Sequence, residues 1–304
     1  MRYIFDDEFR AARAEASPPR ASAGYAAALR SELSRRNLAW ARDHAFAHEV
    51  SLGGVPAVLY REDEAGLHGN FLPAAYRCMR QDPAWARRLM KVHTSARRAL
   101  LSHDPGRREL DSSNSSDALL MNIFCHPGTL RSPEARLLLG VDAEAKPVFG
   151  FKPRVPLRTG GRDCTEIDMR LGDLLIEAKL TEYDFQSAPL RLVERYKDFD
   201  EAFDQERLGI HADRVESYQL IRAVLAAFAS PADRFCVLCD ARRPDLIASW
   251  HRVLLAVKVY DLRCRLLLLT WQELAAVLPG PLQEFLEQKY GIAKYGFAKY
   301  GFDG

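Results

Sequence analysis

Apolar residues recur along this chain with two periods, one typical of helices and one typical of strands. Helical spacing predicts helices over residues 25–38, twice within 72–102, and over 117–125, 215–229 and 245–258. Short apolar or alternating runs predict strands at 51–61, across 147–181, at 235–240 and at 265–270. Because a helix separates the last two strands, part of the sheet should be parallel. The pattern predicts an α/β fold with a mixed central sheet.

No long flexible linker interrupts this pattern, so we predict one α/β domain with an added segment at each end. Residues 1–110 form a mainly helical N-terminal extension, 111–290 form the core, and 291–304 form a tail that repeats a short Lys-Tyr-Gly unit. A chain of 304 residues can bury a sizeable core.

The clearest alternation flanks Gly172-Asp173 in the middle of the chain. A two-residue loop that begins with glycine suits a type II′ hairpin turn, and such a turn fixes which residues face one another. In that register one face of the hairpin is entirely apolar and belongs on the core: Ile167, Met169, Leu171, Leu174, Ile176 and Ala178. The hairpin is therefore predicted to lie on a buried core.

The opposite face of the same hairpin is charged. The register places Asp168 opposite Glu177 and Glu166 opposite Lys179. Two carboxylates about 5 Å apart repel by roughly 3 kcal/mol at an effective dielectric of about 20. A divalent cation would turn this repulsion into coordination, so we predict a Mg²⁺ or Mn²⁺ site with Asp168 and Glu177 as ligands. Glu166 is expected as a further ligand or as the partner that holds the Lys179 amine.

Phosphodiester hydrolysis needs this combination of groups. A metal polarises the phosphoryl oxygen and lowers the pKa of a bound water, while an ammonium orients that water or offsets charge in the transition state. We therefore predict that Asp168, Glu177 and Lys179 form a catalytic site. Glu182 and Asp184, just past the hairpin, are expected at the edge of the pocket.

These residues resemble a known signature. Asp168, eight further residues and then Glu177-Ala178-Lys179 resemble the D-x(n)-(D/E)-x-K motif of the PD-(D/E)XK nuclease superfamily, which includes restriction endonucleases. The flanking elements at 115–125, 147–181, 213–229 and 235–240 are similar to the core of that fold. Ile167 stands where the family name has proline. Three further segments resemble a bacterial branch of restriction endonucleases: Asn114–Phe124, Tyr218–Arg222 and Thr270–Glu273.

The resemblance implies a restriction-endonuclease-like mixed sheet flanked by helices, with the nuclease core over 111–290. It implies a Mg²⁺- or Mn²⁺-dependent endodeoxyribonuclease that acts on DNA, in restriction or defence, and it leaves a homodimer open. It also implies that Gln219, on the helix after the catalytic strands, approaches the active site. Two alternatives stay open: a non-catalytic member of the fold that binds nucleic acid or protein, and a hydrolase that uses the carboxylate pair on a substrate such as a glycoside.

Composition adds little to this picture. The net charge is +2, so no strong overall field points to a polyanionic partner. Arginine pairs such as Arg87-Arg88 and the segment Lys91–Ser95 either contact nucleic acid or lie on solvated surfaces. No apolar run approaches the roughly 20 residues that span a bilayer, and acids at 6–8 do not fit a secretory signal, so we expect a cytoplasmic protein. Cys236 and Cys239 have C-x-x-C spacing but lie in a run that predicts a buried strand.

Overall fold

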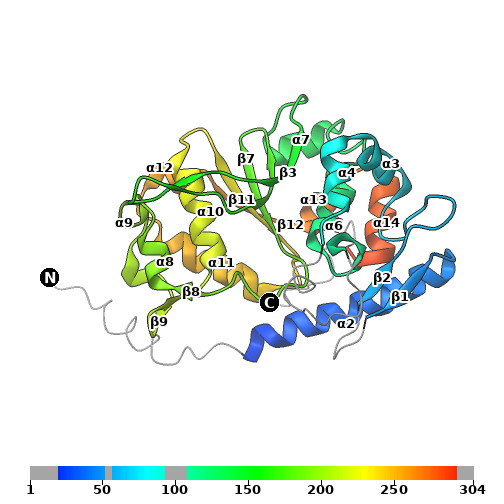
Figure 1. The fold of residues 1–304 in the computed structure, drawn as a ribbon, viewed down its shortest axis with the longest axis horizontal. Coiled ribbons are helices and arrows are strands. Elements are labelled where there is room, and N and C mark those ends of the chain that lie inside the picture. The colour runs from blue at the N-terminus through cyan, green and yellow to red at the C-terminus, as the bar shows by residue number, and fades with distance from the viewer. Residues whose placement is uncertain (1–19, 52–56, 93–107, 293–304) are drawn as a thin grey trace, which may run out of the picture.

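The computed structural model describes residues 20–51, 57–92 and 108–292 (Figure 1). The helices are α2 (Arg20–Asp43), α3 (Pro73–Gln81), α4 (Pro83–Leu89), α6 (Ser116–Phe124), α7 (Pro133–Leu139), α8 (Leu190–Glu194), α9 (Phe199–Ala202), α10 (Tyr218–Ala229), α11 (Pro244–Ala256), α12 (Tyr260–Arg263), α13 (Trp271–Ala275) and α14 (Gly280–Tyr290). The strands are β1 (His48–Val50), β2 (Val58–Tyr60), β3 (Pro147–Phe151), β4 (Val155–Pro156), β5 (Arg162–Asp163), β6 (Ile167–Leu171), β7 (Leu174–Ala178), β8 (Ala188–Pro189), β9 (Ile210–His211), β10 (Arg214–Val215), β11 (Arg234–Cys239) and β12 (Leu266–Thr270). Short 3₁₀ turns lie at Glu109–Asp111 and Gln205–Arg207.

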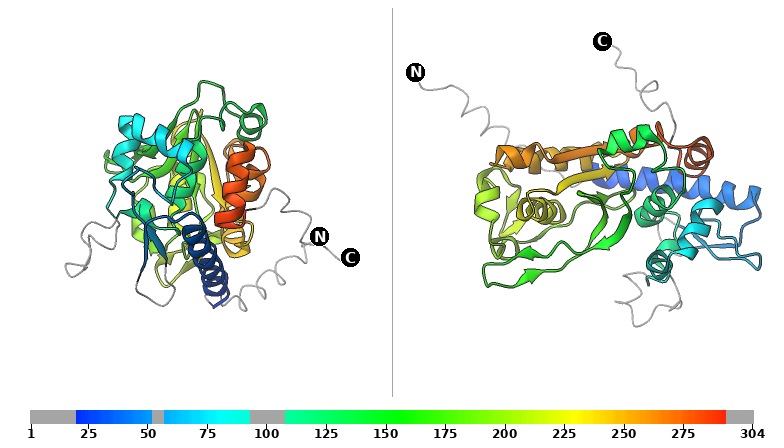
Figure 2. Two further views of the ribbon diagram at one scale, coloured as in Figure 1. Left: turned by 90° about the vertical axis from the view of Figure 1, so that its right-hand side faces the viewer. Right: turned by 90° about the horizontal axis from the view of Figure 1, so that it is seen from above.

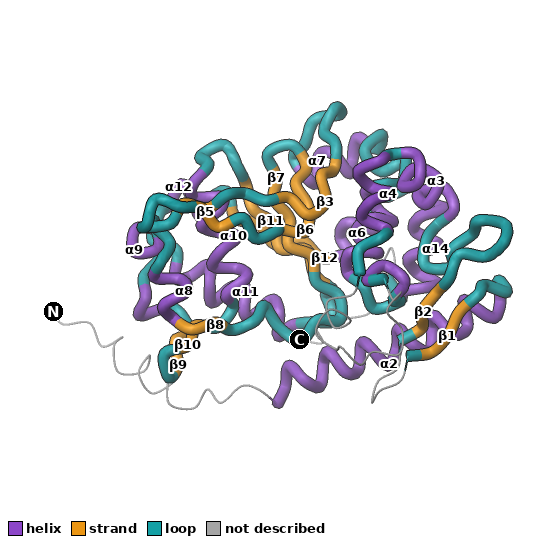
Figure 3. Tube along the Cα trace, viewed as in Figure 1, coloured by secondary structure: helices purple, strands orange, loops and turns teal. Residues whose placement is uncertain are grey.

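A five-stranded mixed sheet forms the centre of the molecule (Figure 3). Its strand order is β12-β11-β7-β6-β3. β3, β6 and β7 pair antiparallel, whereas β11 pairs parallel with both β7 and β12. The predicted mixed sheet is confirmed, and so is the parallel pairing of the two strands that flank α11.

Helices cover both faces of this sheet, and an apolar core lies between the sheet and the helices on each face (Figures 1 and 2). One core joins the sheet to α10 and α11. The other joins it to α6, α13, α14 and α2. β11 serves both cores, because Cys239 packs into the first and Cys236 into the second. The alternation of side chains along a strand explains how one short run supplies two cores.

Several boundaries differ from the predicted ones. The helix expected at 215–229 begins only at Tyr218, because Arg214–Val215 pairs as a strand with β8 and β9, and Ser217 adopts a left-handed φ of +56°. The strand expected at 51–61 is short and spans Val58–Tyr60. Residues 1–19, 52–56, 93–107 and 293–304, with most of the Lys-Tyr-Gly tail, lie outside the described residues. Among the described helices none is long and apolar enough to cross a membrane.

Candidate active site

The hairpin of β6 and β7 forms in the predicted register. Leu171 pairs with Leu174, and Met169 pairs with Ile176. Gly172 has a φ of +60°, as the first central position of a type II′ turn requires. The paired register ends at Met169, and from there the Asp168 Oδ2 atom accepts a hydrogen bond of 2.8 Å from the Ala178 amide. Beyond that point β7 continues alongside β11, with the Lys179 amide donating to the Leu238 carbonyl at 2.8 Å.

Because the pairing of β6 with β7 ends at Met169, one residue packs differently from the prediction. Ile167 was expected on the same face as Met169, opposite Ala178. It packs instead in the core of α10 and α11, whereas Met169 and Ala178 pack in the other core. The physical reason is that Asp168 takes the Ala178 amide with its side chain, so the backbone pairing does not continue past Met169.

Three of the predicted site residues, Asp168, Glu177 and Lys179, lie together just past the end of the β6–β7 pairing that is farther from the turn. The Lys179 ammonium contacts the Glu177 carboxylate at 2.8 Å between Nζ and Oε1. Both residues are buried, with 5% and 1% exposure. The Lys179 Nζ atom also lies 5.7 Å from the centre of the Phe185 ring. A buried acid needs a partner to stay charged, and Lys179 is that partner for Glu177.

Electrostatics couple Asp168 to the same pair. Burial of its carboxyl group, followed by the charges of Glu177 and Asp117, raises the pKa of Asp168 well above its ordinary value. Burial alone would lower the pKa of Lys179, but the carboxylates of Glu177, Asp168 and Glu182 raise it above its ordinary value. The site therefore favours a charged lysine and disfavours a second charged acid.

Two further acids join this cluster. Asp117 lies in the first turn of α6, a helix that starts at Ser116 after the Ser115 hydroxyl caps the Ala118 amide at 3.1 Å. Glu182 lies just after β7, where its Oε2 atom accepts the Leu180 amide at 2.6 Å and its Oε1 atom accepts the Ser116 hydroxyl. Glu182 was expected at the edge of the pocket, whereas Asp117 was predicted only as the start of a helix. An acid in the first turn of the helix before β6 and β7 was the available signal.

Among the described residues, neither Glu166 nor Gln219 has a side-chain hydrogen bond or salt bridge with the Glu177–Lys179 ion pair. The Glu166 carboxylate contacts the Arg88 guanidinium of α4 at 3.1 Å, so its contact is with Arg88 and not with Lys179. Gln219 lies in the first turn of α10, where its backbone amide donates to the Phe185 carbonyl at 3.1 Å. Its Oε1 atom is buried and has no hydrogen-bond partner among the described residues. The functional roles of both residues stay predictions.

The residues present fit a hydrated divalent cation. The described residues contain no group of three or more histidines, cysteines or acids placed to hold a metal ion. Mg²⁺, however, retains several waters and is commonly bound by one or two carboxylates. Asp168 and Glu177 supply two carboxylates whose mutual repulsion a cation would relieve. The donor set matches a hard cation that keeps part of its water shell.

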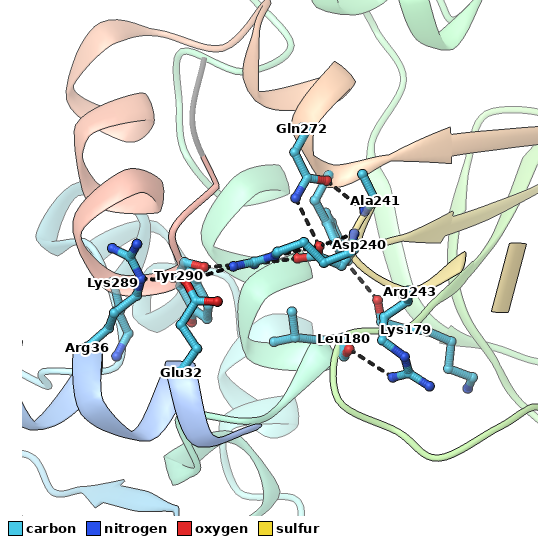
Figure 4. A network of polar contacts seen from close by, with 12 residues as sticks. Glu32, Arg36, Lys179, Leu180, Asp240, Ala241, Arg243, Gln272, Lys289 and Tyr290 are labelled. Carbon is cyan, nitrogen blue, oxygen red and sulfur yellow. Dashed lines mark hydrogen bonds and ion pairs between the residues drawn. The ribbon is translucent and has the colours of Figure 1, made fainter. Parts of the chain in front are cut away.

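A buried network of polar contacts holds the backbone next to the site (Figure 4). The Arg243 guanidinium is fully buried and donates to the carbonyl of Glu182 at 2.7 Å and that of Tyr183 at 3.0 Å. It is also paired with Asp245 at 2.8 Å. The Trp271 indole donates to the Lys179 carbonyl at 2.9 Å. These contacts fix the backbone that carries Lys179 and Glu182.

The mixed sheet and its flanking helices are consistent with a restriction-endonuclease-like fold. Residues 36–291 match the family described as "Restriction Endonuclease associating with ARP", so the chain belongs to that family. The match begins inside the segment assigned to the N-terminal extension. No curated protein and no solved structure matches the chain significantly. Membership of this family indicates a nuclease that acts on nucleic acid.

Proposed function

We propose that this protein is a Mg²⁺- or Mn²⁺-dependent endonuclease of the PD-(D/E)XK type that hydrolyses phosphodiester bonds in DNA. The observation that carries the proposal is the buried Glu177–Lys179 ion pair beside Asp168. Burial and neighbouring acids raise the pKa of the Asp168 carboxyl group. A sequence selected for stability alone has no reason to keep such a cluster. Membership of a restriction endonuclease family supports a role in restriction or defence. We propose that the protein acts in the cytoplasm.

Each side chain has a role in this proposal. Asp168 and Glu177 hold the cation, and Glu166 is a third candidate ligand if it leaves Arg88. When bound, the cation supplies Lewis-acid stabilisation of the phosphoryl oxygens and favours ionisation of the attacking water. Lys179 orients that water and offsets negative charge in the transition state. Its raised pKa keeps the ammonium charged at neutral pH. Gln219 is proposed to support the site from α10.

Cleavage assays with a Lys179→Ala variant test the proposal. Wild-type protein should cut plasmid or single-stranded DNA with Mn²⁺ or Mg²⁺, and chelator should abolish the activity. Loss of the ammonium should lower the cleavage rate about 10²–10³-fold, as removal of one transition-state donor does elsewhere. Product formation on agarose and denaturing gels gives the rate.

Two further variants make the result specific. Asp168→Asn keeps the Glu177–Lys179 pair and should be inactive, which separates loss of the metal ligand from loss of the fold. Lys197→Ala removes an exposed lysine elsewhere and should cut like the wild type. Equal cutting by the wild type and Lys179→Ala would assign the activity to another site. DNA binding without cutting, with either metal, would favour the non-catalytic alternative.

A further inference from the structure

Two cations from the N-terminal part of the chain reach the acid cluster of the candidate active site. The Arg88 guanidinium donates to Asp117 at 2.8 Å and to Glu166 at 3.1 Å. The Lys91 ammonium contacts the same Asp117 oxygen at 3.3 Å and Glu109 at 2.9 Å. Asp117 is one of the charges that raise the pKa of Asp168. Arg88 and Lys91 therefore lie beside the hairpin, although they precede it by a long stretch of chain.

The place of Arg88 is built into the fold. Gly150 of β3 has a φ of +66°, and a β-carbon there would collide with the Arg88 guanidinium and approach Glu166. Arg88 itself has a side-chain exposure of only 11%. Its Nε atom is buried and has no hydrogen-bond partner among the described residues. The guanidinium thus has both terminal nitrogens engaged and its Nε–H group unused.

The two acids that hold Arg88 differ in how firmly they do so. Asp117 has a side-chain exposure of 8% and receives both cations on one oxygen, so this contact is the fixed one. Glu166 has a side-chain exposure of 44%. An ion pair with a largely exposed carboxylate contributes little, about 1 kcal/mol, whereas a hydrogen bond from a guanidinium to a phosphate is charge-assisted on both sides. A phosphate can therefore replace Glu166 at little cost.

We propose that Arg88 and Lys91 form a phosphate-binding pair for the nucleic acid that the candidate site cleaves. In the free protein Glu166 occupies the position on Arg88 that a phosphate can take. In the complex a backbone phosphate takes that position, and Glu166 is released beside Asp168. The pair also supplies positive charge that the site needs, because four carboxylates otherwise face a single lysine as a polyanion approaches: Asp117, Asp168, Glu177 and Glu182. This proposal rests on the proposed nuclease function.

Binding measurements test the pair without requiring cleavage. The affinity of the wild type and of Arg88→Ala for a short fluorescein-labelled DNA duplex is measured by anisotropy over a range of salt concentrations, with Ca²⁺ and separately with chelator. Arg88→Ala should weaken binding about tenfold, as loss of a charged hydrogen-bonding partner does. The slope of log affinity against log salt should become smaller by about one, because one phosphate contact is lost. Lys91→Ala should act in the same direction.

The matched control is the neighbouring Arg87→Ala, which removes an equal charge from the exposed side of the same helix. It should leave both the affinity and the slope close to wild type. Equal losses in Arg87→Ala and Arg88→Ala, or wild-type binding by Arg88→Ala, would overturn the proposal. If Arg88→Ala does not fold, Arg88→Lys decides: weaker binding with an unchanged slope supports a phosphate contact that needs the guanidinium, and wild-type affinity overturns it.

The same samples separate this proposal from the proposed function. Wild-type protein that binds DNA through Arg88 but never cuts it with Mn²⁺ would remove the nuclease proposal and leave the phosphate pair. Wild-type protein that cuts DNA while Arg88→Ala binds as tightly as wild type would remove the phosphate pair alone.

Discussion

Asp168 is a carboxyl group that the fold keeps close to two other acids. Burial and the charges of Glu177 and Asp117 all disfavour its ionised form, whereas the charge of Lys179 and the hydrogen bond from the Ala178 amide favour it. The net effect raises its pKa, so the protein without metal is less stable when Asp168 is charged than when it is neutral. Stability is sacrificed at this position, as is common at functional sites.

An Asp168→Asn variant should therefore be more stable than the wild type in the absence of metal. Asparagine keeps an acceptor for the Ala178 amide and removes the charge. We expect a higher melting temperature at pH 8, by about 2–4 °C for each kcal/mol of repulsion relieved. Thermal unfolding followed by circular dichroism gives the difference.

The sign of the pH dependence follows from the raised pKa. An acid with a raised folded-state pKa contributes stability below its ordinary pKa of 3.8 and loses that contribution as the pH rises through the folded value. The advantage of Asp168→Asn should grow as the pH rises from about 4 and should vanish near pH 4. Mg²⁺ should raise the melting temperature of the wild type but not that of the variant. A variant that melts below the wild type at pH 8 would show that the carboxylate is not under repulsion.

At the scale of elements, the segment after β7 depends on a helix much later in the chain. Arg243 lies at the start of α11 and donates to the carbonyls of Leu180, Glu182 and Tyr183. Figure 4 shows its contact with Leu180. Three carbonyls and Asp245 share this one guanidinium, so no smaller donor can replace it. The orientation of the residues that follow β7 is set by this contact.

Replacement of Arg243 by leucine should destabilise the protein by about 3–5 kcal/mol, because it leaves Asp245 and the carbonyls without their donor. Urea unfolding gives this value. Arg243→Lys should recover little of it, because one ammonium cannot reach the same set of acceptors. Arg252→Leu, on the exposed side of α11, serves as the matched control and should change stability by less than about 0.5 kcal/mol. Similar unfolding curves for both leucine variants would show that Arg243 does not hold this segment.

Local sequence signals were sufficient to predict the hairpin. Alternation and the Gly172-Asp173 turn predicted the register, because both depend only on neighbouring residues. Glu166 was predicted to face Lys179 but contacts Arg88. This contact was not predictable, because it depends on how α4 packs over β3. The same holds for Asp117, whose approach to Asp168 is set by α6 against the sheet. No local pattern distinguishes Arg88 from Arg87, and only the tertiary fold selects between them.

At the scale of the whole molecule, α2 connects distant parts of the chain. It lies beside α14 in Figures 1 and 2. Its Asn37 side chain donates to the Lys289 carbonyl at 3.1 Å, and Arg36 donates to the Glu287 carbonyl at 3.1 Å. Its Arg30 donates to the Thr181 carbonyl at 2.7 Å, just beyond β7. The N-terminal helix is thereby part of the same folded unit as the candidate site.

The contact between α2 and α14 contains a buried lysine with no acid beside it among the described residues. The Lys289 ammonium is fully buried, donates to the Asn37 side chain and lies 4.0 Å from the centre of the Tyr60 ring. A desolvated cation–π contact contributes about 2 kcal/mol, whereas burial of an ammonium costs several. Burial therefore dominates and lowers the pKa of Lys289 well below its ordinary value.

Lys289→Met should consequently stabilise the whole fold at pH 7, because methionine fills a similar volume without a proton to lose. A group with a lowered folded-state pKa contributes stability above its ordinary pKa of 10.5 and loses it as the pH falls. The melting temperature of the variant should exceed that of the wild type at pH 7, and the two should converge as the pH approaches 10.5. Lys152→Met, at an exposed lysine of the loop after β3, should leave the curve unchanged. A variant that is less stable than the wild type at pH 7 would mean that the Lys289 ammonium is charged and that its contacts with Tyr60 and Asn37 outweigh its burial.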